Sequence, residues 1–246
     1  MPFEFNEATV KHPRLGQVEI THWSKFTPAE ILSEIHRVEH DPSQIRHSSL
    51  NSEARVYHGQ LGKHAVSIRA YEPNRDDQPS DQAPTTIFDR LKRSVSAKKT
   101  LLEVPVALVT DSKIDESSGR SKQYLLTIWK NGSPLVTHLT TNSIPLEEKI
   151  RLMKSHVDQV AKLHLKGYTH GHPHFGNSLL RNGKISLLDP NQAHEGLDGK
   201  LDDFKQLNSA VTTLASWLEK NQHLHPEKSA QMKTEMKAYI REKIYP

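Results

Sequence analysis

The segment Thr169-His-Gly-His-Pro-His-Phe-Gly-Asn177 and the later Leu187-Leu-Asp-Pro-Asn191 decide how this chain folds. Between them, two short apolar runs flank Asn182-Gly183, a pair typical of a tight β-hairpin turn. Before them, apolar residues repeat at helical spacing from Leu146 until Gly167 ends the pattern. The sequence therefore predicts a helix, a histidine-rich loop, a hairpin and an aspartate, in this order.

The segment that follows the aspartate is again helical in pattern. Asp202 and Asp203 stand at the start of a helix whose apolar residues recur from Phe204 to Leu218. A polar amphipathic helix is expected to close the chain. Residues 131–246 are therefore expected to form a helical C-terminal lobe around the histidine-rich loop.

The sequence pattern of residues 1–130 is mainly that of β-strands. Strands are expected at residues 54–58, 64–71, 104–110 and 124–129, because apolar and β-branched residues alternate there between turn signals. Two helices are expected within this half. The first begins at Thr27, where Thr27-Pro-Ala-Glu30 has the spacing of a capping box, and the second spans about 85–101. We expect a strand-rich N-terminal lobe with a helical N-terminal extension, and a linker at Lys130–Pro134.

The composition limits the class of protein. The chain has 246 residues, of which 35% are hydrophobic and 25% charged, with a formal net charge of +4. The small basic excess does not indicate nucleic acid as a partner. The absence of cysteine excludes a disulfide framework and a thiolate zinc site. No apolar run has the length of a membrane span and no secretory signal pattern is present, so we expect a cytoplasmic protein, although an effector secreted by an unusual signal would look the same.

Taken together, the loop, the hairpin and the aspartates resemble the protein-kinase-like superfamily, especially the small bacterial branch of lipopolysaccharide and aminoglycoside kinases. In that branch the catalytic loop reads His-Gly-Asp-x-His-x-x-Asn. Here it reads His170-Gly-His172-Pro-His174-Phe-Gly-Asn177. The resemblance covers about residues 146–218 and is thin before them. It implies a two-lobed α+β fold that binds ATP and magnesium and transfers phosphate to a hydroxyl of a protein or a small molecule.

The resemblance assigns roles to several residues of the C-terminal lobe. Asn177 and Asp189 match the two metal-binding positions, and both offer the oxygen ligands that magnesium favours. His174 stands where the family has a basic residue that faces the transferred phosphate. Asp203, with Asp202 as a near alternative, matches the aspartate that ties down the loop backbone. His170 is expected to be a packing and hydrogen-bonding residue.

His172 departs from the family because it occupies the position of the catalytic aspartate. The aspartate orients the acceptor hydroxyl and takes its proton. A neutral imidazole can also accept a proton near neutral pH, but it brings no negative charge and is bulkier. Two interpretations follow: an unusual histidine-based transfer site, or a protein in which transfer is impaired or absent.

The N-terminal lobe matches the family less closely. Arg69, in the strand Val66-Ser-Ile-Arg69, takes the place of the lysine that holds the nucleotide phosphates, and the swap is not conservative. Asp89 is the candidate for its acidic partner. The segment Leu50–Ala54 lacks the glycines that let the backbone approach phosphates.

Three classes of function stay open at this point. The first is an atypical kinase, with His172 and His174 as catalytic residues. The second is a pseudokinase that acts as a protein-binding module. The third is a metal-dependent hydrolase in which His170, His172 and His174 hold zinc or another transition metal. Taken singly, each of these residues also has a plain structural explanation, such as a turn, a surface charge or a helix-start acid.

Overall fold

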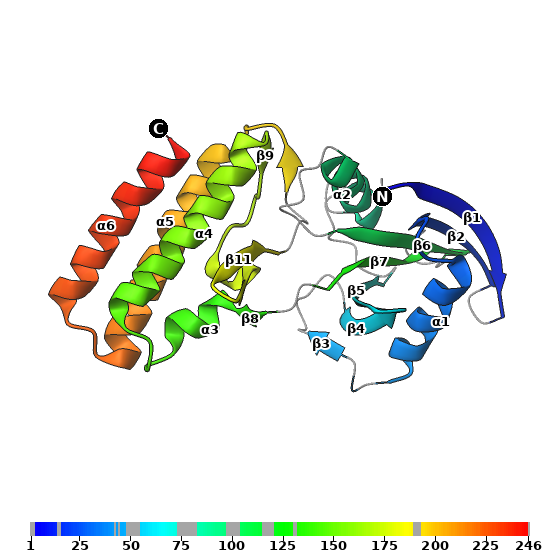
Figure 1. Ribbon diagram of the computed structural model, residues 1–246, viewed down its shortest axis with the longest axis horizontal. Helices are drawn as coiled ribbons and strands as arrows, with labels where there is room; N and C mark the ends of the chain where they lie inside the picture. The colour runs from blue at the N-terminus through cyan, green and yellow to red at the C-terminus, as the bar shows by residue number, and fades with distance from the viewer. Residues whose placement is uncertain are drawn as a thin grey trace. The chain divides into compact units, whose positions relative to one another are not determined.

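The computed structural model describes residues 3–13, 16–41, 43, 45–47, 55–72, 83–96, 104–114, 121–129, 132–188 and 193–245. The chain divides into two compact units between Trp129 and Lys130. Strands predominate in the first unit and helices in the second, as Figure 1 shows. The α+β class expected from the sequence is confirmed.

The first unit is built on one antiparallel sheet with the strand order β1-β2-β6-β7-β5-β4-β3. Neighbouring strands pair antiparallel throughout. The expected strands are present, and β5 lies near the middle of the sheet between β7 and β4. The strands are β1 (Phe5–His12), β2 (Gly16–Trp23), β3 (Ile45–His47), β4 (Arg55–Leu61), β5 (His64–Tyr71), β6 (Pro105–Ile114) and β7 (Ser121–Ile128).

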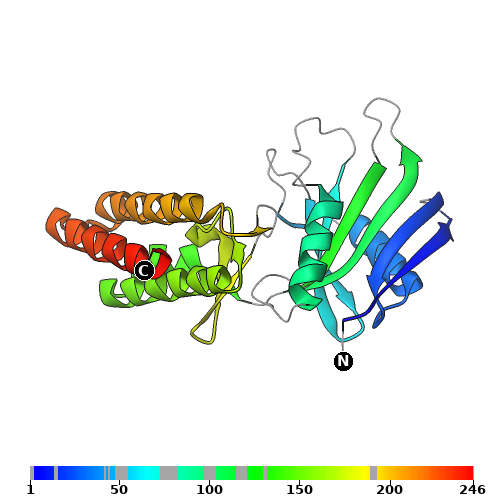
Figure 2. The ribbon, with the colours of Figure 1, turned by 90° about the horizontal axis from the view of Figure 1, so that it is seen from above.

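Two helices cover opposite faces of this sheet (Figure 2). Helix α1 (Pro28–Glu39) begins with the expected capping box. The Thr27 hydroxyl accepts from the backbone N–H of Glu30, and the Glu30 carboxylate accepts from the backbone N–H of Thr27. Its apolar side, which includes Ile31 and Ile35, joins the sheet residues in the main hydrophobic cluster. Helix α2 (Pro84–Ser96) buries Ile87, Phe88 and Leu91.

The start of the chain corrects one expectation. The N-terminal extension is not only helical, because the hairpin of β1 and β2 precedes α1 and lengthens the sheet. The side chains of β1 are either exposed or half-buried, and none is fully buried. The sequence of this strand therefore lacks the clear apolar pattern from which a strand is predicted. The strand expected at 104–110 extends further than predicted, because Asp111 pairs with Val18 of β2 and β6 continues to Ile114.

The second unit is a helical layer beside short strands. Helices α4 (Leu146–Leu165), α5 (Lys200–Gln222) and α6 (Pro226–Ile244) lie side by side (Figure 1). The hairpin of β10 (Ser178–Arg181) and β11 (Lys184–Leu187) turns at Asn182 and Gly183, as predicted; both have positive φ. Among the residues placed in the structure, no helix has the length and apolar character needed to cross a membrane.

A short strand lies within the linker expected at Lys130–Pro134. Ser133 and Pro134 form β8, which pairs with Leu180 and Leu179 of β10, and helix α3 (Leu135–Thr140) follows directly. The loop between α4 and β10 contains β9 (Tyr168–Thr169), paired with β12 (His194–Glu195), and a single 3-10 turn at Phe175–Asn177. The histidine-rich segment is therefore a loop and lies in neither a continuous strand nor a continuous helix, as expected.

Candidate functional site

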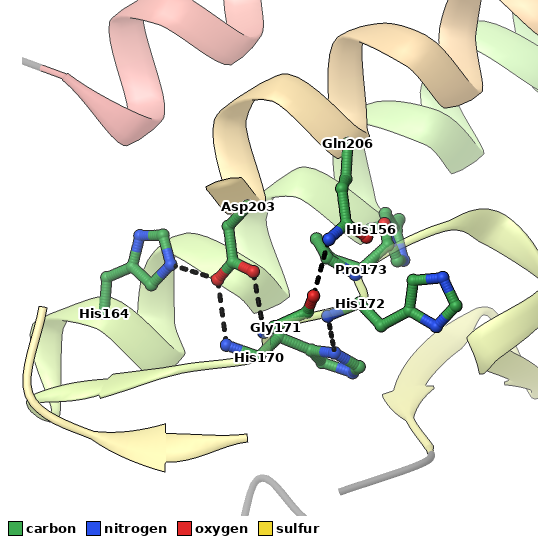
Figure 3. Close-up of polar contacts among 8 residues, drawn as sticks. All are labelled: His156, His164, His170, Gly171, His172, Pro173, Asp203 and Gln206. Atoms are coloured by element: carbon green, nitrogen blue, oxygen red, sulfur yellow. Dashed lines mark hydrogen bonds and ion pairs between the residues drawn. The ribbon is translucent and has the colours of Figure 1, made fainter. Parts of the chain in front are cut away.

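The histidine-rich loop is attached to helix α5 by one buried carboxylate (Figure 3). Asp203 is fully buried in the first turn of α5. Its Oδ2 accepts from the backbone N–H of His170 at 2.8 Å, and its Oδ1 accepts from the N–H of Gly171 at 2.7 Å. The expectation that Asp203 ties down the loop backbone is confirmed. Asp202 is exposed and pairs with Lys205 at 3.5 Å instead.

The same carboxylate also accepts from helix α4. His164 Nε2 donates to Asp203 Oδ2 at 2.8 Å, since a carboxylate oxygen only accepts. Gln206, one turn further along α5, donates to the carbonyl of Gly171 at 2.6 Å. Gly171 has φ = 79°, a backbone conformation that residues with a β-carbon rarely adopt. The peptide around Gly171 is thus held on both its donor and its acceptor side.

His156 of α4 holds the next stretch of the loop. It is fully buried, and its Nε2 donates to the carbonyl of Pro173 at 2.9 Å. Burial lowers the pKa of His156 from 6.5 to about 4, so the ring is neutral at physiological pH. Its Nδ1 therefore carries no hydrogen and accepts from the Ser178 hydroxyl at 2.9 Å. The ring joins the middle of the loop to the first residue of β10.

His170 lies inside the unit and not at its surface. It is fully buried, and burial lowers the pKa of its ring to about 4. Its Nδ1 accepts from the backbone N–H of His172 at 3.3 Å. This supports the expectation that His170 is a packing and hydrogen-bonding residue.

His172, His174 and Asn177 are close together at the end of the loop. The rings of His172 and His174 meet edge to face, with centroids 4.4 Å apart. Asn177 Nδ2 donates to the carbonyl of His172 at 2.9 Å, and its contact with His172 Nδ1, at 3.5 Å, is long for a hydrogen bond. His174 Nδ1 accepts from Gly176 N–H at 3.0 Å. The His172 ring points away from Asp203 (Figure 3).

The three alternating histidines do not form a metal site. His170 is buried and its Nδ1 accepts from the N–H of His172, whereas His172 and His174 are half-buried and their rings meet edge to face. Within the ranges that the structure describes, no group of three or more His, Asp or Glu side chains is placed to hold a metal ion. This geometry gives the hydrolase alternative no support, because a zinc site needs its imidazoles to converge.

The candidates of the N-terminal unit are placed individually. Arg69 is half-buried on β5, where its backbone pairs with Val56 and Leu125. Asp89 is on the exposed side of α2 and forms an ion pair with Lys92 at 3.9 Å. The pairing of Arg69 with Asp89 stays a prediction. The glycine-poor segment Leu50–Ala54 lies outside the described residues, and so does Asp189.

Three residues that support the loop were not anticipated: His156, His164 and Gln206. Both histidines lie on the buried side of α4: His156 is three residues after Met153, and His164 is four residues after Val160. A histidine at a predicted core position of a helix is a usable signal, because a buried imidazole needs hydrogen-bond partners. Gln206 follows Asp203 by three residues and so faces the same side of α5, which is a weaker signal.

Comparison with known proteins gives a likeness of structure only. No family model and no curated protein sequence matches the chain. Among solved structures, WaaP in complex with acyl carrier protein is 14% identical, with a TM-score of 0.49 over 90% of this chain and 98% of that one. A divergent kinase that lacks the glycine-rich loop and regulates membrane ultrastructure of the Toxoplasma parasitophorous vacuole is 18% identical. Its TM-score is 0.48 over 73% of this chain and 63% of that one.

The chain is thus similar in structure to these two proteins at low sequence identity. Both TM-scores lie below 0.5, so neither structure carries an argument about activity. The functional proposal below depends on the hydrogen bonds that Asp203, His156 and Gln206 form with the loop backbone.

The two low-pKa histidines predict how stability depends on pH. Burial lowers the pKa of His156 and of His170 from 6.5 to about 4 in the folded state, whereas in the unfolded chain each protonates near its ordinary value. Their contribution is fully present above about pH 6.5 and is lost as the pH falls toward 4. We expect the free energy of unfolding of the helical unit to decrease by a few kcal/mol over this interval.

Urea unfolding, followed by circular dichroism at several pH values, measures this decrease. In His156→Gln one of the two titrating groups is absent, so the stability of the variant should fall less steeply with pH. A decrease of equal steepness in the variant and in the original protein would show that His156 does not titrate as its burial implies.

Proposed function

We propose that this chain is a kinase-like protein that binds ATP with magnesium and transfers a phosphoryl group to a hydroxyl, with His172 in place of the usual aspartate. The supporting observation is the hydrogen bonding of the loop. Asp203 holds the backbone at His170 and Gly171, and Asn177 is bonded to the carbonyl of His172. Phosphoryl transfer depends mainly on positioning and charge, and a loop held at this many points supplies positioning.

Asn177 fits a magnesium site by the chemistry of its side chain. Its amide nitrogen donates to the His172 carbonyl, and its amide oxygen Oδ1 is an oxygen donor. Magnesium favours hard oxygen donors, and Asp189 is the second donor that we propose. When bound, magnesium neutralises charge on the phosphate oxygens.

The other roles belong to the same proposal. His174 Nδ1 accepts from Gly176 N–H, so in the neutral ring Nε2 carries the hydrogen and is the donor that would face a phosphate oxygen. Arg69 supplies positive charge to the nucleotide phosphates, and Asp89 is its proposed acidic partner. In our proposal, His172 orients the acceptor hydroxyl and accepts its proton on the bare nitrogen of a neutral imidazole.

The test of this proposal is a titration of the protein with ATP, with and without magnesium, followed by a transfer assay with radiolabelled ATP. We expect magnesium-dependent binding and transfer of label to a hydroxyl-bearing acceptor. ATP binding without transfer would favour the pseudokinase alternative. The absence of ATP binding both with and without magnesium would contradict the proposal.

We expect Asp189→Ala to abolish the magnesium-dependent part of the ATP affinity and to leave the fold intact, because the variant removes one of the two proposed oxygen donors. Calorimetric titration with and without magnesium measures the difference. The matched control is Asp198→Ala, since Asp198 is an exposed aspartate of the segment before α5. Equal affinity in both variants would make Asp189 a turn residue only.

A further inference from the structure

We propose that one end of the helical unit docks onto the surface of an anionic phospholipid bilayer. Among the side chains that the structure describes, five large hydrophobic ones are exposed, and four of them belong to this end. These four, the apolar tips, are Leu165, Leu197, Leu201 and Tyr245. Leu165, the last residue of α4, is 87% exposed and therefore projects into solvent.

Two contacts bring together the segments that carry the apolar tips. The segment that carries Leu197 is bonded to the end of α4, because Gly196 N–H donates to the carbonyl of Gly167 at 2.8 Å. Tyr245 stacks edge to face on Phe204 of α5, with ring centroids 5.2 Å apart. Figure 1 shows the C-terminal end of α6 on the same side of the unit as the end of α4 that leads into β9.

Basic side chains are interspersed among the apolar tips. Two acids of this end are paired with lysines, Asp202 with Lys205 and Glu242 with Lys243, and the Asp203 carboxylate is buried. Four further basic residues belong to the same end: Lys162, Lys166, Lys200 and Arg241. Among the described side chains of this end, Asp198 is a further acid, so basic groups exceed acidic ones once the ion pairs are set aside. This mixture complements a surface with negative headgroups over an apolar interior.

The alternatives fit these tips less well. A second copy of the chain on a two-fold axis would bring the same basic residues face to face, with repulsion between them. A stable protein partner needs about 800 Å² of complementary surface on each side, with anchors that fill pockets. The interfacial layer of a bilayer accepts single apolar side chains at any spacing, so protruding leucines among lysines suit it better.

Co-sedimentation of the full chain with vesicles tests the proposal without reference to nucleotide or transfer. We expect binding to phosphatidylcholine vesicles that contain phosphatidylglycerol, little binding to phosphatidylcholine alone, and weaker binding at high salt. Leu165→Ser combined with Leu201→Ser should weaken binding by about tenfold or more, because two inserted side chains become polar. Lys162→Ala and Lys166→Ala should each weaken it by about fivefold.

Val136→Ser is the matched control, because Val136 is the fifth exposed hydrophobic residue and belongs to α3, outside this end. Its vesicle binding should equal that of the original protein. Because all the changed residues are exposed or half-buried, the helical circular dichroism should be the same in every variant. The proposal is overturned if the double leucine variant and the control bind equally, or if anionic lipid gives no binding. Self-association that the double leucine variant abolishes, without vesicle binding, would assign the apolar tips to a second copy instead.

Discussion

Asp203→Ala is expected to destabilise the helical unit by about 4 kcal/mol and to remove any ATP binding. The carboxylate is fully buried and accepts from the backbone N–H groups of His170 and Gly171 and from the His164 ring. Without it, these three donors would be buried without an acceptor, and breaking such a buried charged interaction typically costs 3–5 kcal/mol. Urea unfolding that follows Trp217 fluorescence measures the loss, since Trp217 is the one tryptophan of residues 130–246.

Asp202→Ala is the control for this prediction, because Asp202 is adjacent in sequence but exposed. Its ion pair with Lys205, at 3.5 Å, joins two exposed side chains, so its loss should change stability by less than about 0.5 kcal/mol. A second variant, Asp203→Asn, keeps the size of the side chain but replaces one accepting oxygen by an NH2 group that faces N–H donors. It should therefore also be strongly destabilised. Equal stability of the Asp202 and Asp203 variants would contradict the role of Asp203 as the anchor of the loop.

Elements with strong local signals were predicted correctly from the sequence. The capping box at Thr27, the Asn182-Gly183 turn and the apolar stripes of α4 and α5 each depend on neighbours within a few residues. The histidine-rich segment was predicted as a loop for the same reason, since Gly171 and Pro173 interrupt regular structure. Such features can be predicted because the interactions that cause them are short in sequence.

Features that depend on distant partners were missed. The hairpin of β1 and β2 owes its place in the sheet to pairing between β2 and β6, and Val18 and Asp111 are far apart in sequence. Likewise, His156 and His164 looked like helix residues, and their roles depend on acceptors in the loop and in α5. The pairing of Ser133 and Pro134 with β10 was missed as well, because no local pattern reveals this contact.

His172 decides between an enzyme and a binding module, and its replacement is expected to have the largest effect on transfer. If His172 accepts the proton of the hydroxyl, His172→Ala should lower the transfer rate by about a hundredfold, the usual effect of losing a positioned base. His172→Asp should preserve or raise the rate, because an aspartate orients the hydroxyl and accepts its proton as well. Transfer should also decrease at acid pH, since an imidazolium cannot accept a proton.

Single-turnover transfer and ATP affinity, measured on the same samples, separate the outcomes. Affinity should change little in both variants, because in our proposal His172 is not a metal donor and Asn177 bonds to its backbone carbonyl. Acid pH also destabilises the unit through His156 and His170. The pH profile of transfer by the original protein must therefore be compared with the profile of His172→Asp, because this variant has the same loss of stability at acid pH. ATP binding with no transfer in all three proteins would make the chain a binding module. If transfer is equally fast with Ala, Asp and His at position 172, the assignment of His172 as base is wrong. Positioning and the charge of the metal would then suffice for a loose transition state.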